Sequence, residues 1–202
     1  MKYEAFQYLY PPRPETRIPQ GALSFYEKRG WWAQVKKNGT CTVIFSHGDE
    51  VIFMTRHNDE HKAWTAPLEI ADFFKGHGSW NVFVAELIHN KVRGIRDQLY
   101  LFDQIVLDGE QLVGSTFLER QKQLQTRWNI TSGEDDLLRV HPNISVAANF
   151  SSGFADVFKR LKPEDEGLVL KDPNGILKPC FKEGLNGSWQ VKSRITTKNS
   201  AF

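Results

Sequence analysis

The chain has 202 residues, of which 40% are hydrophobic, 25% charged and 12% aromatic. This composition is typical of a folded globular domain, and it excludes a disordered tail, a collagen and a coiled coil. Lysine and arginine total 26 against 24 for aspartate and glutamate, a formal charge of +2 that does not by itself indicate a nucleic-acid partner.

Membrane proteins and proteins built around a zinc site or disulfides are also disfavoured. The sequence has no apolar run of about 18 residues and no N-terminal signal peptide, so we expect a soluble, cytoplasmic protein with no membrane contact. Cys41 and Cys180 lie far apart without neighbouring histidines, so we expect two free thiols rather than a zinc site or a disulfide.

The first part of the chain predicts short elements. Residues 1–30 are rich in proline and arginine and predict an extended lead-in with a short helix over Leu23–Lys28. β-prone segments at 31–36, 41–45 and 51–55 are separated by glycine-containing turns. This spacing predicts a meander of short antiparallel strands.

The remainder of the chain alternates strands with isolated helices, which favours an α+β fold. Strands are predicted from apolar, β-prone segments, and helices from a capping-box spacing or from apolar residues at i, i+3, i+4 and i+7. The predicted elements are a helix from Pro67 to Gly76, central strands Asn81–Ile88 and Gln98–Leu107, a helix from Thr116 to Trp128, a helix through Phe154, Val157, Phe158 and Leu161, and strands Glu166–Lys171 and Ser188–Arg194.

Lys36 is the first residue that could carry chemistry. It follows an apolar strand, so we expect its amine to be partly desolvated, which lowers the pKa of a lysine and makes it available as a nucleophile. Gly39, three residues later, would let the backbone approach a bound phosphate. The same Lys-Lys-Asn-Gly run is also typical of a solvated hairpin, and the spacing alone does not separate the two interpretations.

Three further features have both a functional and a structural interpretation. Glu86 lies in an otherwise apolar strand, where a carboxylate needs a cation, a ligand or an edge position. Lys192 and Arg194 share one face of the last strand, so they could hold a phosphate together or lie on a solvated edge. Phe102 could stack on a base, although a core position is the commoner reason for a phenylalanine in a strand.

Taken in order, six segments resemble the covalent nucleotidyltransferases, the superfamily of ATP-dependent DNA ligases, RNA ligases and messenger-RNA capping enzymes. The segments are Lys36-x-Asn38-Gly39, Thr55–Asn58, Ala85–Leu87, Phe102–Asp103 with Asp108–Gly109 and Glu119–Arg120, Glu166–Lys171, and Trp189–Arg194. No single segment would suffice, but together they cover nearly the whole chain. The stretch from Phe102 to Leu124 looks most like the ATP-dependent DNA ligases.

The resemblance implies a fold and a reaction. The fold would be a single adenylation domain over residues 1–202, with antiparallel sheets flanked by helices around an ATP pocket, in an ATP-grasp-like nucleotidyltransferase arrangement. In the reaction, a lysine attacks ATP to form lysyl-AMP, AMP passes to a 5′-phosphate end, and a 3′-hydroxyl displaces AMP to seal the strand. The cofactors would be ATP with Mg²⁺ or Mn²⁺, and the partner of this monomer would be nicked duplex DNA or RNA.

The resemblance also implies a role for individual residues. These are Lys36 as nucleophile, Gln34 at the adenine edge, Arg56 at the phosphates and the strand end, Glu86 at the ribose, Phe102 stacked on adenine, Glu166 at the metal, and Lys192 and Arg194 at the phosphates, with help from Lys171, Lys178 and Lys182.

The sequence departs from the family pattern in three places. Asn38 stands where the family usually has aspartate and Cys41 where it has arginine, as in some RNA ligases. The last motif usually has two lysines one residue apart; we prefer Lys192 with Arg194, and Gln190 with Lys192 is the alternative. Only eight residues follow Arg194, so we expect no oligonucleotide-binding second domain in this sequence. The preferred function is DNA ligation, and the alternatives are RNA ligation and a non-catalytic nucleic-acid-binding module that retains the nucleotide pocket.

Overall fold

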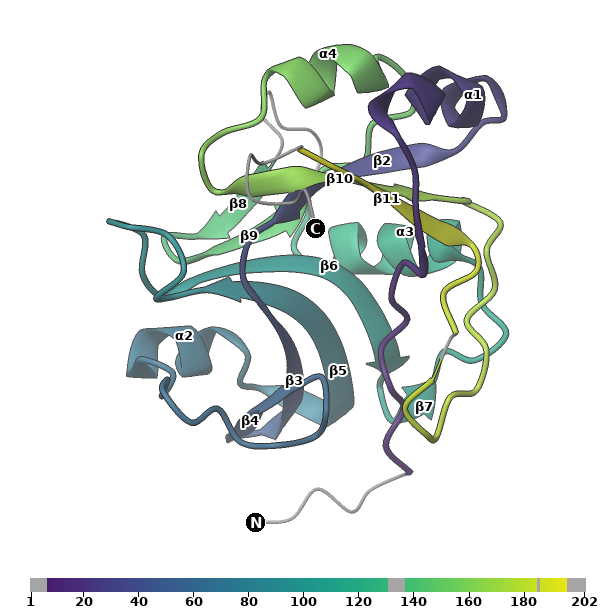
Figure 1. Ribbon diagram of the computed structural model, residues 1–202. Coiled ribbons are helices and arrows are strands. Elements are labelled where there is room, and N and C mark those ends of the chain that lie inside the picture. The colour runs from purple at the N-terminus through teal and green to yellow at the C-terminus, as the bar shows by residue number, and fades with distance from the viewer. Residues whose placement is uncertain (1–6, 131–136, 185, 196–202) are drawn as a thin grey trace.

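The computed structural model describes residues 7–130, 137–184 and 186–195, which form two β-sheets with helices packed against them (Figure 1). The strands are β1 (Thr16–Arg17), β2 (Trp32–Lys37), β3 (Thr40–Gly48), β4 (Glu50–Thr55), β5 (His77–Ile88), β6 (Gln98–Leu107), β7 (Glu110–Gln111), β8 (Leu137–His141), β9 (Ile144–Ala147), β10 (Asp165–Lys171) and β11 (Gln190–Arg194). The α-helices are α1 (Leu23–Lys28), α2 (Leu68–Phe73), α3 (Phe117–Arg127) and α4 (Phe154–Lys159), and a short 3-10 turn, η1 (Gln20–Ala22), precedes α1.

The two sheets differ in size and in the segments that build them. The larger sheet has the strand order β4-β3-β5-β6-β9-β8, with β7 paired to β6 outside this path. The smaller sheet has the order β1-β11-β10-β2 and so joins the first strands of the chain to the last. Most pairs are antiparallel, as predicted, but β1 with β11 and β6 with β9 run parallel. The α+β class is confirmed.

Strand β2 does not pair with the strand that follows it, so the predicted three-strand meander is wrong. β2 pairs antiparallel with β10, whereas β3 pairs with β4 and β5 in the other sheet. The chain therefore crosses between the sheets at Asn38 and Gly39 instead of turning in a hairpin. A Cβ added at Gly39 would lie 2.4 Å from the Leu87 backbone oxygen, so the close approach of β5 is itself a reason for glycine here.

Helices cover one face of each sheet (Figure 1). On the smaller sheet, α1 and α4 bury Leu23 and Phe154 against Leu168 of β10. On the larger sheet, α2 buries Ile70 against the apolar side chains of the sheet, and Leu124 of α3 belongs to the same core. These contacts explain the apolar spacing within the short helices, which are too short to be stable without such packing.

The N-terminus of α3 has the predicted capping box. The Thr116 hydroxyl accepts a hydrogen bond from the Glu119 N–H at 3.2 Å, and the Glu119 carboxylate accepts one from the Thr116 N–H at 2.7 Å. The two bonds satisfy backbone donors that the first turn of a helix leaves free. The helix ends at Arg127, with Trp128 as its C-cap.

Other boundaries differ from the predicted ones. β8 and β9 are absent from the predicted elements, because each is short and neither has a distinct alternating pattern. Helix α4 ends at Lys159, and Leu161 packs against the same core from beyond the helix. β11 begins two residues later than predicted, since the N–H of Gln190 closes a turn onto the carbonyl of Gly187. None of the helices in the described ranges has the length and apolarity needed to cross a bilayer.

Candidate active site

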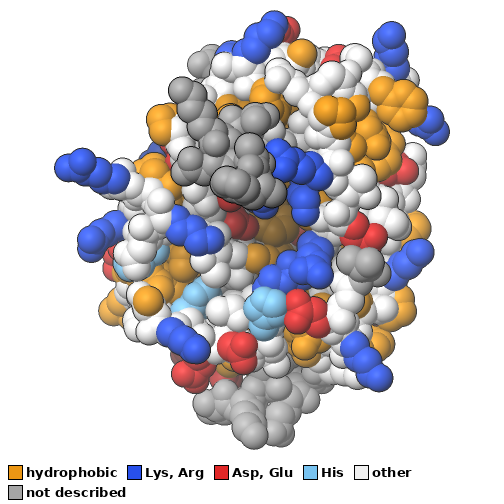
Figure 2. Space-filling model, viewed as in Figure 1, with side chains coloured by type: hydrophobic (Ala, Val, Ile, Leu, Met, Phe, Trp, Pro, Cys, Tyr) orange, Lys and Arg blue, Asp and Glu red, His pale blue; other side chains and the backbone are white. Residues whose placement is uncertain are grey.

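A cavity of about 310 Å³ lies between the two sheets. Its walls come from β2, β10 and β11 of the smaller sheet, from β3, β5, β6 and β9 of the larger sheet, and from the extended segment Pro12–Pro14. Figure 2 shows a hollow near the centre of the viewed face, with Lys and Arg side chains beside it and hydrophobic side chains at its floor. The volume lies in the range of pockets that hold small molecules.

Most residues assigned from the sequence meet in this cavity. The lining includes Gln34, Lys36, Arg56, Glu86, Phe102, Lys192 and Arg194. Glu166 does not line the cavity, but its Oε2 lies 2.5 Å from Lys36 Nζ and 3.3 Å from an Arg194 guanidinium nitrogen. Residues from six separate strands or strand ends are therefore brought to one site.

The two neighbouring lysines of β2 have different partners. Lys36 Nζ forms an ion pair with Glu166, and 18% of the Lys36 side chain remains exposed. Lys37 Nζ lies 2.6 Å from Asp165 Oδ1, in an ion pair whose side chains are almost completely buried. The Asp165 carboxylate also accepts the Lys162 N–H at 2.7 Å. Lys37 is thus held in a structural pair, whereas Lys36 can reach a molecule in the cavity, and neither belongs to a solvated hairpin.

Glu86 occupies a central strand and not a sheet edge. Its Oε1 accepts a hydrogen bond from the Gly39 N–H at 3.0 Å, and it forms no ion pair among the described residues. Burial raises the pKa of Glu86, while the charge of Lys36 and the Gly39 N–H act in the opposite direction. The carboxylate therefore has polar support on one side and faces the cavity with the other.

Strand β11 contributes two cations to the cavity wall. Gln190, Lys192 and Arg194 all line the cavity, because residues at i, i+2 and i+4 of a strand share one face. Burial lowers the pKa of Lys192, and the nearby charges of Arg194 and Lys36 lower it further. Such clustered positive charge favours a bound anion.

Arg56, which follows β4, adds to this charge. Its side chain lines the cavity, and its Nε is buried without a hydrogen-bond partner in the described part of the chain. The Arg56 N–H donates to the Cys41 carbonyl at 3.2 Å. The backbone of Arg56 thus lies next to the position where the family pattern has arginine and this chain has cysteine. Burial raises the pKa of the Cys41 thiol to about 12, so this group is a thiol and not a thiolate at neutral pH.

The three lysines expected to assist with phosphates behave differently. Lys178 and Lys182 are exposed and do not line the cavity, so the structure does not bring them to this site. Lys171 lines the cavity but is only 3% exposed, and its ammonium lies 5.0 Å from the Phe102 ring centre and 4.6 Å from that of Phe117. Burial lowers the pKa of Lys171 to about 7. Two aromatic rings lie close to the ammonium, and the charges of Asp103 and Arg120 act on its pKa in opposite directions.

A buried ion pair supports the aromatic wall. Arg120 of α3 donates two hydrogen bonds to Asp103, at 2.9 and 3.1 Å, and a third to the Ser115 carbonyl at 3.0 Å. Both side chains of the pair are at most 4% exposed. Because Asp103 directly follows Phe102, this fork holds the strand segment that presents the Phe102 ring to the cavity.

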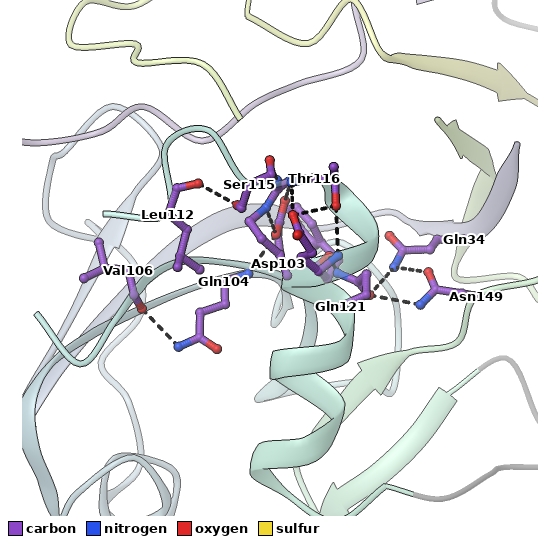
Figure 3. A network of polar contacts seen from close by, with 12 residues as sticks. Gln34, Asp103, Gln104, Val106, Leu112, Ser115, Thr116, Gln121 and Asn149 are labelled. Carbon is purple, nitrogen blue, oxygen red and sulfur yellow. Dashed lines mark hydrogen bonds and ion pairs between the residues drawn. The ribbon is translucent and has the colours of Figure 1, made fainter. Parts of the chain in front are cut away.

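A second support is a group of amide side chains that the sequence analysis missed. Gln34 of β2, Gln121 of α3 and Asn149 are joined by hydrogen bonds behind the cavity wall (Figure 3). Asn149 follows β9, a strand that was not predicted, so no local signal marked it. The capping box placed Gln121 on a helix but did not show which neighbour it meets.

Glu166 is the carboxylate beside Lys36 that could bind a divalent cation. The described residues contain no cluster of three or more His, Cys, Asp or Glu side chains that could hold a metal. Glu166 uses Oε2 for both of its ion pairs, and its Oε1 has no hydrogen-bond partner within the described ranges. A single carboxylate acting with substrate phosphates and water is a common arrangement for Mg²⁺, so the donor set fits such an ion.

Comparison with known proteins shows which proteins this chain resembles in sequence. No protein-family model matches the chain. DNA ligase 2 from Methanosarcina mazei is 30% identical over 113 residues, which cover 54% of this chain and 18% of that protein. The chain thus spans about a fifth of the length of this curated relative.

Solved structures share the fold. The ligase domain of M. tuberculosis LigD superposes with a TM-score of 0.64 at 18% identity, over 91% of this chain and 59% of that one. A mycobacterial DNA ligase D complexed with ATP and MES gives a TM-score of 0.62 at 19% identity, over 95% of this chain and 62% of that one. The chain therefore has the fold of the nucleotidyltransferase domain of DNA ligases. Within that class it resembles the adenylation domain of ATP-dependent DNA ligases, and the resemblance found in the sequence is confirmed.

Proposed function

We propose that the chain acts as the adenylation domain of an ATP-dependent polynucleotide ligase, which seals 5′-phosphate/3′-hydroxyl nicks in DNA through a lysyl-AMP intermediate. One observation carries the proposal. The candidate nucleophile Lys36, the cationic residues of β11, Glu86 and Phe102 all line a single cavity. The curated relative is a DNA ligase, and it supports DNA over RNA as the substrate.

In the first step, Lys36 Nζ attacks the α-phosphorus of ATP. A P–N bond forms, the P–O bond to the β-phosphate breaks, and pyrophosphate leaves. The amine must lose a proton to attack, and Glu166 Oε2 at 2.5 Å is placed to accept it. Lys192 and Arg194 would neutralise the charge on the transferring phosphoryl group, which is the main requirement of such a step.

The nucleotide would be held by the cavity walls. The Phe102 ring is the surface on which adenine stacks, and Gln34 contacts the edge of the base. Glu86 would accept a hydrogen bond from a ribose hydroxyl, which compensates the burial of its carboxylate. Glu166 would hold a divalent cation together with the ATP phosphates, and bound there the ion supplies neutralising charge.

The later steps use the same residues. An oxygen of the DNA 5′-phosphate attacks the phosphorus of lysyl-AMP, a P–O bond forms, the P–N bond breaks, and the amine of Lys36 regains a proton. The 3′-hydroxyl oxygen then attacks the phosphorus of the 5′-phosphate: a new P–O bond forms, the P–O bond to AMP breaks, AMP leaves, and the hydroxyl proton passes to solvent. Arg56 would bind the 5′-phosphate, since its buried Nε has no partner among the described residues.

The test is covalent labelling with α-³²P-labelled ATP and Mg²⁺. We expect an acid-labile P–N adduct on the native chain and none on Lys36→Arg, because guanidinium keeps the cation beside Glu166 but is not a nucleophile. Lys122→Arg, at an exposed position of α3, is the matched control and should label normally. Label on Lys36→Arg, or stronger labelling by GTP than by ATP, would show the assignment to be wrong. Faster sealing of nicked RNA than of matched nicked DNA would favour the RNA ligase alternative.

A further inference from the structure

We propose that a chain of hydrogen bonds from the Phe102 carbonyl through Gln121 to Gln34, hereafter the amide relay, makes the pocket select a purine with a 6-amino group. In this role Gln121 and Asn149 are positioning residues. The inference rests on the proposed function, because it requires that a nucleotide base reaches Gln34 in the cavity.

The amide relay begins at a group that can only accept a hydrogen bond. Gln121 Nε2 donates to the Phe102 carbonyl at 2.9 Å, so the Gln121 side chain has its NH₂ on that side. Its Oε1 must then face the other way, where it accepts from Asn149 Nδ2 at 3.0 Å and from Gln34 Nε2 at 3.2 Å. The backbone carbonyl therefore sets the orientation of the first amide, and the first amide sets the other two.

Both protons of the Gln34 amide are used in this arrangement. Gln34 Nε2 donates to Gln121 Oε1 and also to Asn149 Oδ1, the latter at 2.9 Å. Figure 3 shows the Gln34 oxygen on the side away from these two acceptors. That oxygen accepts no hydrogen bond from any described residue, although Gln34 as a whole is only 3% exposed and lines the cavity.

Reversing the Gln34 amide would be unfavourable. Its oxygen would then face two other amide oxygens. Asn149 Oδ1 would lose the donor that Gln34 provides, and Gln121 Oε1, in a residue that is 1% exposed, would keep only the bond from Asn149 Nδ2. The pocket therefore presents a fixed hydrogen-bond acceptor to the base.

A fixed acceptor distinguishes purines by their substituent at C6. The 6-amino group of adenine donates a hydrogen bond to it, whereas the 6-oxo group of hypoxanthine or guanine places two acceptors against each other. The amide relay starts at the carbonyl of Phe102, the proposed stacking residue. The Phe102 ring and the Gln34 oxygen therefore keep a constant position relative to each other. Discrimination then depends on Gln121, a residue that does not itself line the cavity.

The test compares three nucleotides on the native chain: ATP, purine riboside triphosphate, which has hydrogen at C6, and inosine triphosphate, which has oxygen there. Dissociation constants from calorimetry should rank ATP tightest and inosine triphosphate weakest, with about tenfold or more between these two, as expected for one buried hydrogen-bond mismatch. Equal or reversed affinities of purine riboside triphosphate and inosine triphosphate would overturn the proposal.

The variant Gln121→Met keeps the side-chain length and removes the amide relay. Gln34 and Asn149 can then reverse, so binding of inosine triphosphate should improve and the preference for ATP should fall about tenfold. Gln125→Met makes the same change elsewhere on α3, at a residue that does not line the cavity, and should keep the preference. A general loss of structure would weaken all three nucleotides together, so it does not imitate this result.

The outcomes separate this inference from the proposed function. If Lys36 is labelled by ATP but Gln121→Met keeps the native preference, the inference is wrong and the proposed function stands. If the ranking and its loss are observed but no lysyl-AMP forms, the amide relay stands and ligase chemistry does not. Should the native chain bind none of the three nucleotides, both are wrong.

Discussion

Replacing Arg120 by methionine tests whether the buried ion pair supports the wall of the cavity. The Arg120 side chain is 0% exposed and the Asp103 side chain 4%, and the pair shares two hydrogen bonds. Without the guanidinium, the Asp103 carboxylate keeps the Gln104 N–H at 2.9 Å but loses its ion-pair partner. Leaving one charge of a buried pair uncompensated costs about 3–5 kcal/mol. For a chain of this size, in which 1 kcal/mol shifts the Tm by about 2–4 °C, this corresponds to a fall in Tm of about 6–20 °C.

The measurement is urea unfolding followed by circular dichroism, with the free energy of unfolding extrapolated to water. Lys122→Met, at an exposed position of the same helix, is the control and should change stability by less than about 0.5 kcal/mol. The double variant Asp103→Leu/Arg120→Met removes both charges, so it should be more stable than Arg120→Met by at least about 1 kcal/mol. The reasoning is refuted if Arg120→Met loses less than about 1 kcal/mol, or if the double variant is no more stable than the single one.

Two further predictions concern the cavity walls. Burial lowers the pKa of Lys171 to about 7 in the folded chain, whereas an unfolded lysine titrates near about 10.4. Between these values the unfolded state binds one more proton than the folded state, so Lys171 makes the free energy of unfolding rise with pH, by up to about 1.4 kcal/mol per pH unit. Lys171→Met should therefore flatten the plot of unfolding free energy against pH between about pH 7.5 and 9.5. Parallel plots for the native chain and the variant would contradict this. At Gly39, an added Cβ would lie 2.4 Å from the Leu87 oxygen and 2.7 Å from Glu86 Cγ, so Gly39→Ala should cost about 1–3 kcal/mol and reduce labelling of Lys36. Gly78→Ala is the control, because no atom lies within 4 Å of the Cβ added there. Equal Tm values for the two variants would show that β5 moves away from the Cβ at position 39 without a cost in stability.

Several elements of this fold follow from local sequence alone. The capping box at Thr116 and Glu119 needs only residues three apart, and the structure has it as predicted. Asp108 and Gly109 both adopt positive φ in the turn after β6, a conformation for which aspartate and glycine are suited. The two central strands β5 and β6 were found because long apolar, β-prone runs are distinctive in any context.

Partners between distant segments could not be found in this way. The pattern of β2 shows that it is a strand, but its pairing with β10 depends on residues about 130 positions later, at Asp165–Lys171. β-propensity describes a half-buried, pleated surface and does not specify which strand covers it. The same limit concealed β9, which pairs in parallel with β6.

The candidate site divides along the same line. From the sequence, the resemblance to the nucleotidyltransferases implied a lysine nucleophile, two carboxylates, an aromatic residue and a basic last strand. Only the tertiary structure decided that Lys37 forms a buried ion pair with Asp165, whereas Lys36 forms an ion pair with Glu166 beside the cavity. It also decided the partners of Gln34. Burial and the direction of a hydrogen bond are properties of groups that meet in space, and residues such as Gln121 and Asn149 acquire them only when the sheets and α3 have assembled.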